Sequence, residues 1–283
     1  MARVGMEGEA GGPSVLGMTR RAVLGAGATC LACLAYESLR PAKVGAAGTP
    51  LPPTDTTARR RRTQPDAVFR VPTNKPIVAL SFDDGPDPRY TPQVLDMLDH
   101  FRARATFFVV GLNALAHRDL AADIKGGGHS FGNHTFDHID LEELSQSRVR
   151  DEIERAASAF HTAGVPATTM FRPPKGYTSP DVRLATVHDK YRTIYWDACV
   201  EHFVNHMPVA TGVDRMLHHV APGSVILAHD GGTIAGTGRP PLDRSRTIEA
   251  LPLLLAGLKR KGLTVVDVRT LLAEERHTTP RVS

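Results

Sequence analysis

The paired carboxylates Asp83 and Asp84 have the clearest chemical potential in this sequence, because they directly follow an apolar run at 77–80. Two carboxylates at the end of a buried strand are costly unless a cation or hydrogen-bond donors compensate their charge. His134 and His138 are spaced so that one helical turn or a tight loop can aim both imidazoles at one point. Together these residues offer an Asp/His/His set for a divalent metal ion, and the spare carboxylate beside it can act as a general base.

The ligand atoms indicate which metals would suit such a site. One carboxylate oxygen and two imidazole nitrogens leave an open coordination position on zinc, the usual plan of a catalytic site, and mixed N/O ligation also suits cobalt. Thr135 stands where an H-E-x-x-H metalloprotease would have Glu, which argues against that class. The competing interpretation is an acidic turn at Asp83-Asp84-Gly85-Pro86 and two surface histidines among the 13 of the chain.

Strands and helices are predicted to alternate from about Phe69 onward. Helical spacing begins at Thr91-Pro92, an N-cap followed by Pro at the first helical position, and recurs at Glu142–Ala163 and Ile248–Lys261. Pro252 is expected to kink that last helix or to mark its first turn. The alternation indicates an α/β fold with a parallel sheet, open or closed. The predicted strands are Ile77–Phe82, Ala105–Val110, Thr169–Phe171, Thr193–Trp196, Ser224–Ala228 and Leu263–Val268.

Polar residues follow several of these strands directly. Asp83 and Asp84 come after the first strand, and Arg172, Asp197 and His229 each come after a later one. Barrels and open parallel sheets gather their active sites at the carboxyl ends of the strands. We therefore expect these side chains to converge at one edge of the sheet.

Four short motifs, found in the same order, make the chain similar to a known family. It resembles the polysaccharide deacetylases, also called the NodB-homology domain or carbohydrate esterase family four, over roughly residues 70–275. The family's T-F-D-D-G-P, H-[ST]-x-x-H, R-P-P-x-G and L-x-H-D motifs correspond to Ser81–Pro86, His134–His138, Arg172–Gly176 and Leu227–Asp230. The resemblance implies a distorted, incomplete (β/α) barrel. It also implies metal-dependent removal of N-acetyl or O-acetyl groups from a polysaccharide such as peptidoglycan or a chitin-like glycan, with release of acetate.

The resemblance assigns roles to individual residues. It implies that Asp83 is the catalytic base, that Arg172 orients this base, and that His229 is the general acid. The backbone N–H of Lys175 would help to hold the oxyanion. The implied metal ligands are Asp84, His134 and His138.

Two departures from the family pattern affect the expected site. Lys175 takes a place usually held by an aromatic residue, so it offers no stacking surface. The fourth motif, D-x-x-D-W, is altered: Asp197 matches its leading Asp, and Phe203 replaces its tryptophan. Either Glu201 or His202 falls where the Asp that supports the catalytic histidine belongs. These changes concern rate and substrate choice more than the class of reaction.

Two other functions remain open from the sequence. Gly128–Gly132 fits G-x-S-x-G, which would make Ser130 the nucleophile of a serine hydrolase. The residues before it, at 123–127, are polar and glycine-rich, whereas that motif needs a buried strand. The departures at Lys175 and Asp197 would also fit a carbohydrate-binding relative with little or no turnover, although the other motif residues are intact.

The N-terminal region predicts export. Arg20-Arg21 before a weakly apolar stretch at 22–35 is typical of a twin-arginine signal, predicted over 1–46, with Met18 as an alternative start. A flexible linker is predicted at 47–68, the catalytic domain at 69–276 and a tail at 277–283. We expect an exported protein, extracellular or associated with the cell wall. An uncleaved leader that anchors it to the membrane is an alternative, and Arg59–Arg62 could contact anionic wall polymer or lipid.

The charge balance restricts the partners. Residues 66–283 carry 25 Lys and Arg against 26 Asp and Glu, so the basic excess belongs to the leader and linker. The domain therefore has no basic surplus that would indicate nucleic-acid binding. The Gly/Thr loop after His229 does not precede a phosphate cradle, so we expect no nucleotide site. The expected partner is an acetylated glycan, and the sequence does not indicate an oligomeric state.

Overall fold

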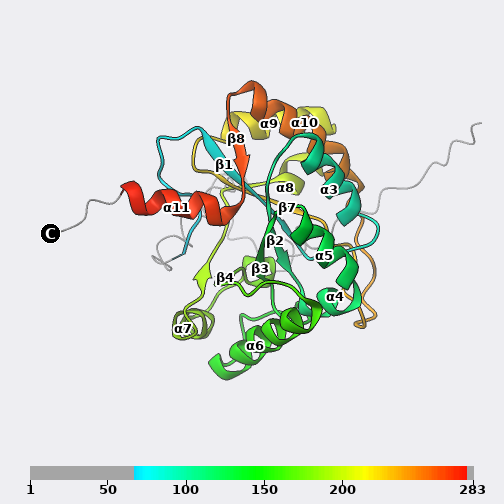
Figure 1. Ribbon diagram of the computed structural model, residues 1–283, viewed down its shortest axis with the longest axis vertical. Coiled ribbons are helices and arrows are strands. Elements are labelled where there is room, and N and C mark those ends of the chain that lie inside the picture. Colours follow the sequence, from blue (N-terminus) through cyan, green and yellow to red (C-terminus); the bar gives the residue numbers. More distant parts are fainter. Residues whose placement is uncertain (1–66, 279–283) are drawn as a thin grey trace, which may run out of the picture.

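The computed structural model describes residues 67–278 (Figure 1). The predicted export signal, most of the predicted linker and most of the predicted tail lie outside the described residues. Val68, which we placed in the linker, is buried, and its N–H donates to Thr193 O at 2.9 Å. At the other end the last helix continues to Thr278, two residues beyond the expected limit of the domain. The folded unit is thus slightly longer at both ends than predicted.

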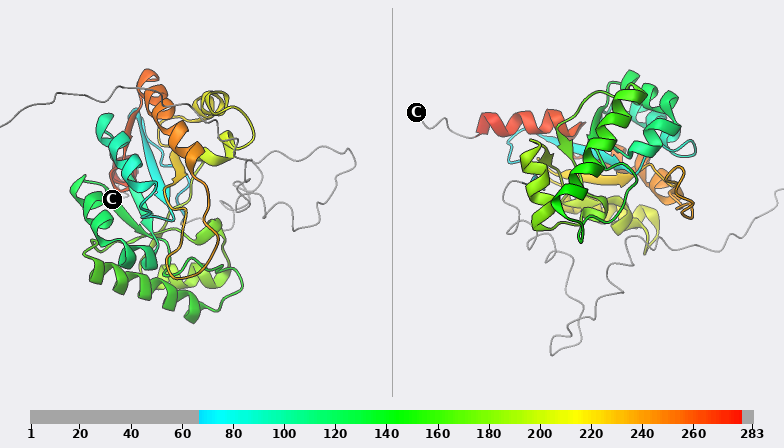
Figure 2. Two further views of the ribbon diagram at one scale, coloured as in Figure 1. Left: turned by 90° about the vertical axis from the view of Figure 1, so that its right-hand side faces the viewer. Right: turned by 90° about the horizontal axis from the view of Figure 1, so that it is seen from below.

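A parallel sheet forms the centre of the molecule. Its strands run in the order β5-β4-β3-β2-β1-β7-β6, and β8 pairs with the first half of β1. The sheet curls into an incomplete barrel with helices around its outside (Figures 1 and 2), which confirms the predicted α/β half-barrel. The strands are β1 (Ile77–Asp83), β2 (Thr106–Val109), β3 (Ser130–Asn133), β4 (Met170–Phe171), β5 (Arg192–Thr193), β6 (Ala198–Cys199), β7 (Val225–His229) and β8 (Thr264–Val266).

The helices cover the sheet, and in the described part of the chain all except α11 lie between two consecutive strands. Their buried faces carry apolar residues at helical spacing, as Val94 and Leu98 do in the first of them. The helices are α3 (Thr91–His100), α4 (Gly111–Ala116), α5 (Arg118–Gly126), α6 (Gln146–Ala163), α7 (Pro180–His188), α8 (Val200–Val204), α9 (Val209–His219), α10 (Ser245–Arg260) and α11 (Val268–Thr278), with a 3₁₀ turn η1 (Pro174–Gly176). In the described part of the chain, no helix combines the length and apolar character needed to cross a membrane.

Strand β1 separates two hydrophobic clusters by the alternation of its side chains. Val78, Leu80 and Phe82 belong to the larger cluster, which includes the apolar faces of α3 and α10. Ala79 belongs to the smaller cluster, with Phe108 and the α11 residues Val268 and Leu271. Because successive side chains of a strand point to opposite faces, Ser81 and Asp83 lie on the same face as Ala79. This alternation directs Asp83 toward the inside of the half-barrel.

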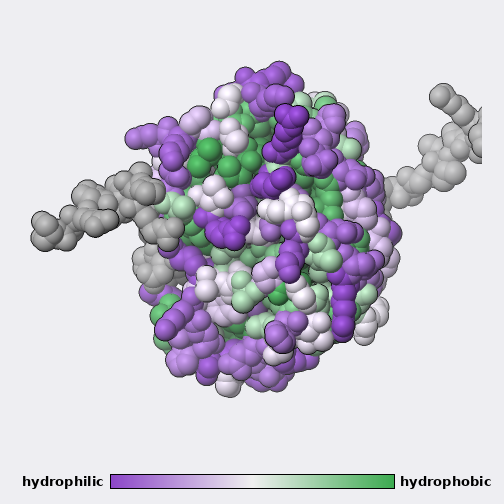
Figure 3. All heavy atoms as spheres, in the orientation of Figure 1, coloured by the Kyte–Doolittle hydropathy of each residue, from purple (hydrophilic) through white to green (hydrophobic). Residues whose placement is uncertain are grey.

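The face of the molecule in Figure 3 is mainly hydrophilic. Large apolar side chains that are clearly exposed include Leu184 and Val187 on α7 and Leu253 on α10. Scattered exposed apolar residues are normal for a folded domain.

Several predicted boundaries were wrong for local reasons. Of the predicted strand Thr193–Trp196 only Thr193 lies in a strand, because β5 ends at Thr193 and β6 begins at Ala198, beyond the predicted range. Strand β3 was not predicted, since its sequence Ser-Phe-Gly-Asn lacks an apolar pattern although every residue is buried. Helix α6 begins at Gln146, four residues later than expected.

Two predictions about helix ends also needed correction. Thr91 is not the N-cap of α3: Tyr90 occupies that position, and the Thr91 hydroxyl donates to Asp230 Oδ2 at 2.6 Å. The Thr91 hydroxyl oxygen accepts the N–H of Asp87 at 2.8 Å instead of an N–H of the first helical turn. Pro252 does not mark the first turn of α10, which begins seven residues earlier at Ser245.

Candidate active site

The end of β1 and the turn after it place two carboxylates side by side. Asp83 is the last residue of β1, and Asp84 follows it with a φ of 73°. This left-handed backbone conformation is unfavourable for most residues other than Gly, Asn and Asp, and it turns Asp84 away from the direction of the strand. Both side chains are almost fully buried. Gly85 then passes so close to Asp230 that any side chain at position 85 would overlap the Asp230 carboxylate.

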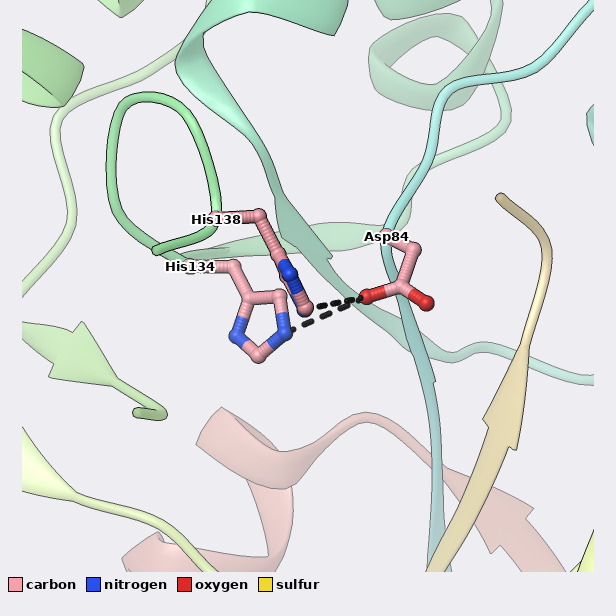
Figure 4. A group of neighbouring side chains, drawn as sticks. All are labelled: Asp84, His134 and His138. Atoms are coloured by element: carbon pink, nitrogen blue, oxygen red, sulfur yellow. Dashed lines mark ion pairs between the residues drawn. The ribbon is translucent and has the colours of Figure 1, made fainter. Parts of the chain in front are cut away.

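The loop after β3 brings two histidines to Asp84 (Figure 4). Asp84 Oδ1 lies 3.1 Å from His138 Nε2 and 3.4 Å from His134 Nε2. Glu152 of α6 holds this loop in place, because its Oε2 accepts the N–H of Phe136 at 3.2 Å. The predicted metal set therefore converges in space, with one atom from each of three residues within 4.8 Å of the other two.

The surroundings of these atoms fit a bound cation. Asp84 Oδ1 is buried and accepts no hydrogen bond from any residue in the range 67–278. His134 Nδ1 lies 2.8 Å from Arg172 O, an acceptor, so Nδ1 carries the proton and the Nε2 lone pair faces Asp84. Burial would raise the pKa of Asp84, but the charge of His138 outweighs this effect and holds that pKa well below its usual range. The Asp84 carboxylate is therefore ionised.

Arg172 fixes the neighbouring carboxylate. It is fully buried, and its Nη1 donates to Asp83 Oδ1 at 2.6 Å and to Ser81 Oγ at 3.0 Å. The guanidinium also donates to the carbonyl oxygens of Ile194 and Tyr195. Its burial lowers the pKa of Arg172, and the opposite charge of Asp83 counteracts this effect. Asp83 Oδ2 is left 3.7 Å from His134 Nε2, beside the candidate metal site.

His229 and Glu201 form a second pair at the same edge of the sheet. His229 ends β7 and is in register with Asp83 of β1. Its Nδ1 lies 3.1 Å from Glu201 Oε2, and its backbone N–H donates to Glu201 Oε1 at 3.0 Å. Burial would lower the pKa of His229, but the negative charge of Glu201 outweighs it and raises that pKa. The Glu201 carboxyl has a pKa of about 2, because the charge of His229 opposes the effect of its burial.

The structure separates the residues of the altered fourth motif. Glu201 contacts His229, whereas His202 is exposed and packs edge-on against Phe203. Asp197 lies away from the site: its Oδ1 accepts the N–H of Val225, at the amino end of β7, and its Oδ2 accepts Arg70 Nε. Four residues of strand separate Val225 from His229, roughly 13 Å. Placing Asp197 at the carboxyl edge was therefore wrong, because β5 ends four residues before it and β6 begins after it.

The Lys175 side chain pairs with Asp140 rather than with a residue of the candidate metal set. Its ammonium donates to Asp140 Oδ2 at 2.9 Å on the exposed rim. Among residues 67–278, its backbone N–H has no hydrogen-bond acceptor. The residue has a φ of 57°, within η1 directly after Arg172 and its two prolines. The free N–H is available to an external acceptor.

Three further buried residues that support the site were not predicted. Asn113 of α4 donates to the Asp84 carbonyl oxygen at 2.7 Å, and Arg244 donates to Asp84 Oδ2 at 2.8 Å. Glu152 holds the histidine loop, as described above. These residues lie in segments that carry no motif. The only signal for Glu152 was that a polar residue stands at a position that the helical pattern predicts to be buried.

Ser130 does not have the surroundings of a nucleophile. It begins β3, so it lies at the amino end of a strand whose carboxyl end leads to His134. Its hydroxyl pairs with Thr106 Oγ1 at 2.7 Å, and the adjacent His129 uses Nδ1 to accept the Ala105 N–H. Ser130 therefore has a structural role, and the G-x-S-x-G match does not mark a nucleophile.

Comparison with known proteins places the chain in a family. The model of the polysaccharide deacetylase family matches residues 70–194. A peptidoglycan-N-acetylglucosamine deacetylase of Bacillus cereus is 35% identical over 208 residues, 72% of this chain and 92% of that protein. A chitooligosaccharide deacetylase of Sinorhizobium fredii is 34% identical over 202 residues, 70% of this chain and 93% of that protein. The chain belongs to the polysaccharide deacetylase family.

Solved structures agree with this assignment. The crystal structure of the Bc1960 peptidoglycan N-acetylglucosamine deacetylase superposes with a TM-score of 0.65 and 28% identity. The superposition covers 73% of this chain and 92% of that chain. The half-barrel is thus the fold of the family, and the chain is a hydrolase of the polysaccharide deacetylase type.

Proposed function

We propose that this protein removes acetyl groups from an acetylated glycan in a reaction that depends on a divalent metal ion. The observation that carries the proposal is the convergence of Asp84, His134 and His138 beside a base, Asp83, and an acid, His229. Zinc suits this ligand set best, and cobalt is the alternative. A cation held there supplies Lewis acidity, which polarises the acetyl carbonyl and activates water.

Asp83 is proposed to accept the proton from the attacking water. Arg172 occupies Asp83 Oδ1 and leaves Oδ2 facing the site, so a single oxygen is available as base. General-base catalysis by a positioned carboxylate typically contributes about 10²–10⁴-fold to the rate.

His229 is proposed to protonate the departing amine, while the Lys175 N–H donates to the oxyanion. Glu201 keeps His229 protonated at higher pH, because it raises the pKa of the imidazole. Asp83 takes up one proton and His229 gives up another, so the pair returns to its starting state after one proton passes between them through solvent.

The substrate class is inferred from the relatives and from the N-terminal sequence. The relatives act on peptidoglycan and chitooligosaccharides by name. Together with the predicted export signal, this supports an N-acetylated glucosamine polymer outside the cell, with peptidoglycan first and chitin-like glycan second. O-acetylated glycan is the alternative substrate.

Acetate release from a panel of glycans tests this proposal. The chelator-stripped protein would be assayed on peptidoglycan, chitin oligomers and acetylated xylan, each with and without added zinc or cobalt. We expect acetate from at least one N-acetylated glycan, and only with metal. Binding of glycan without acetate release under any metal would favour a carbohydrate-binding relative instead.

Replacing Glu201 by Gln is expected to shift the basic limb of the kcat–pH profile to lower pH. The pKa of His229 is raised by the Glu201 carboxylate, so loss of that charge lets the imidazole deprotonate at a lower pH. The acid form is then depleted at neutral and basic pH, where activity falls first. His202→Gln, one residue along and exposed, is the matched control and should leave the profile unchanged. An unshifted basic limb in Glu201→Gln would rule out His229 as the acid that Glu201 supports.

A further inference from the structure

Arg244 links the start of α10 to the candidate metal site. It is the N-cap residue of α10 and is almost fully buried. Its Nη2 donates to Asp84 Oδ2 at 2.8 Å, and its Nε donates to Gly231 O at 2.8 Å. The planar guanidinium is therefore tied both to the backbone after β7 and to the side chain that follows β1.

This contact makes the two oxygens of Asp84 different. Oδ2 is occupied by Arg244, while Oδ1 accepts no hydrogen bond within the described residues and faces both histidines. A carboxylate can bind a metal through one oxygen or through both, and it can rotate between these arrangements. The Arg244 contact holds one rotamer and offers a single oxygen at a fixed position.

The same helical turn also contacts the acid pair. Thr247 lies three residues after Arg244, and residues at this spacing share one face of a helix. Its hydroxyl donates to Glu201 Oε1 at 2.7 Å, and Glu201 Oε2 lies against His229. The first turn of α10 thus contacts the metal ligand Asp84 through Arg244. It also contacts Glu201, the partner of the general acid His229, through Thr247.

We propose that Arg244 is a positioning residue that restricts Asp84 to binding the metal through Oδ1. The first turn of α10 thereby aligns the metal ligand Asp84 with the Glu201–His229 pair. The proposal rests on the metal site proposed above. It differs from a role in charge compensation alone, in which Arg244 would merely offset the negative charge of Asp84. The two roles predict opposite effects on metal affinity.

The test measures the zinc dissociation constant of the stripped protein by competition with a chromophoric chelator. If Arg244 positions Asp84, Arg244→Gln should weaken zinc binding by about 10–100-fold, the usual effect of losing an outer partner of a metal ligand. Arg244→Lys keeps the charge but cannot reproduce the two-pronged donation, so it should remain at least about tenfold weaker than wild type. If Arg244 only compensates charge, Arg244→Gln should bind zinc as tightly as wild type or more tightly.

Arg246 provides the matched control. It lies on the same turn, and its guanidinium donates to the carbonyl oxygens of Val204 and Met207 rather than to the site. Arg246→Gln should lower the melting temperature but leave the zinc dissociation constant within about twofold of wild type. Melting curves of all metal-free variants show whether each one is folded, and Arg244→Lys decides the matter if Arg244→Gln does not fold.

The outcomes separate this proposal from the proposed function. Zinc binding by wild type with an unchanged constant in both Arg244 variants would overturn the positioning role and leave the metal site intact. Equal weakening by Arg246→Gln and Arg244→Gln would also overturn it, since the effect would then belong to the helix start in general. Failure of wild type to bind zinc would instead contradict the metal site itself.

Discussion

Asp83→Asn is expected to lower kcat for acetate release by about 10²–10⁴-fold, the usual contribution of general-base catalysis. The amide has nearly the same shape as the carboxylate but cannot accept a proton from water. Because Asp84, His134 and His138 are unchanged, the variant should still bind one equivalent of zinc. The measurement is steady-state acetate release by the metal-loaded variant, together with its zinc content.

Asp197→Asn is the matched control for this substitution. It makes the same chemical change at a buried carboxylate that binds Arg70 and Val225 at the amino end of β7. It should lower the free energy of unfolding by about 1–3 kcal/mol and leave kcat within a few-fold of wild type. Asp83→Asn with near-normal kcat, or Asp197→Asn with an equal loss, would remove Asp83 from the role of base.

His138→Ala is expected to have the second large effect, the loss of bound zinc and with it of activity. The substitution removes the ligand atom that lies 3.1 Å from Asp84 Oδ1 and leaves only two protein ligands. Zinc affinity should fall by more than the roughly 10–100-fold expected for outer partners of a ligand. Zinc content after dialysis and kcat at saturating zinc are the two readouts.

His117→Ala is the control for this variant, since His117 is half-buried like His138 but lies between α4 and α5. It should retain zinc and activity. Excess zinc should partly restore activity to His138→Ala if the ligand is lost and the fold is kept. A variant that retains stoichiometric zinc after dialysis would show that His138 is not a ligand.

The sequence predicted the first strand and the two carboxylates well because their signal is local. The apolar run before Asp83, followed by Gly85-Pro86, defines a buried strand and its end without any tertiary information. The predicted strand boundary near Asp197 was wrong because two short strands lie within one stretch of eight residues. A single apolar pattern cannot separate two strands that are so close. The error placed Asp197 at the wrong end of the sheet.

Residues that act through long-range contacts could not be predicted in this way. The choice between Glu201 and His202 stayed open until α8 directed Glu201 inward and His202 outward. Arg244 is separated from Asp84 by 160 residues, and neither its neighbours nor its spacing distinguishes it from the other arginines of the chain. Only the packing of α10 against the sheet brings the two side chains together.

Titration of the chelator-stripped protein with zinc, with acetate release as the readout, tests the central claim most directly. If Asp84, His134 and His138 hold one catalytic ion, activity on an N-acetylated glycan should be absent without metal and should rise until about one zinc is bound per chain. His138→Ala should stay inactive at that ratio. Full activity in the stripped protein, or a rise that His138→Ala reproduces, would contradict the claim.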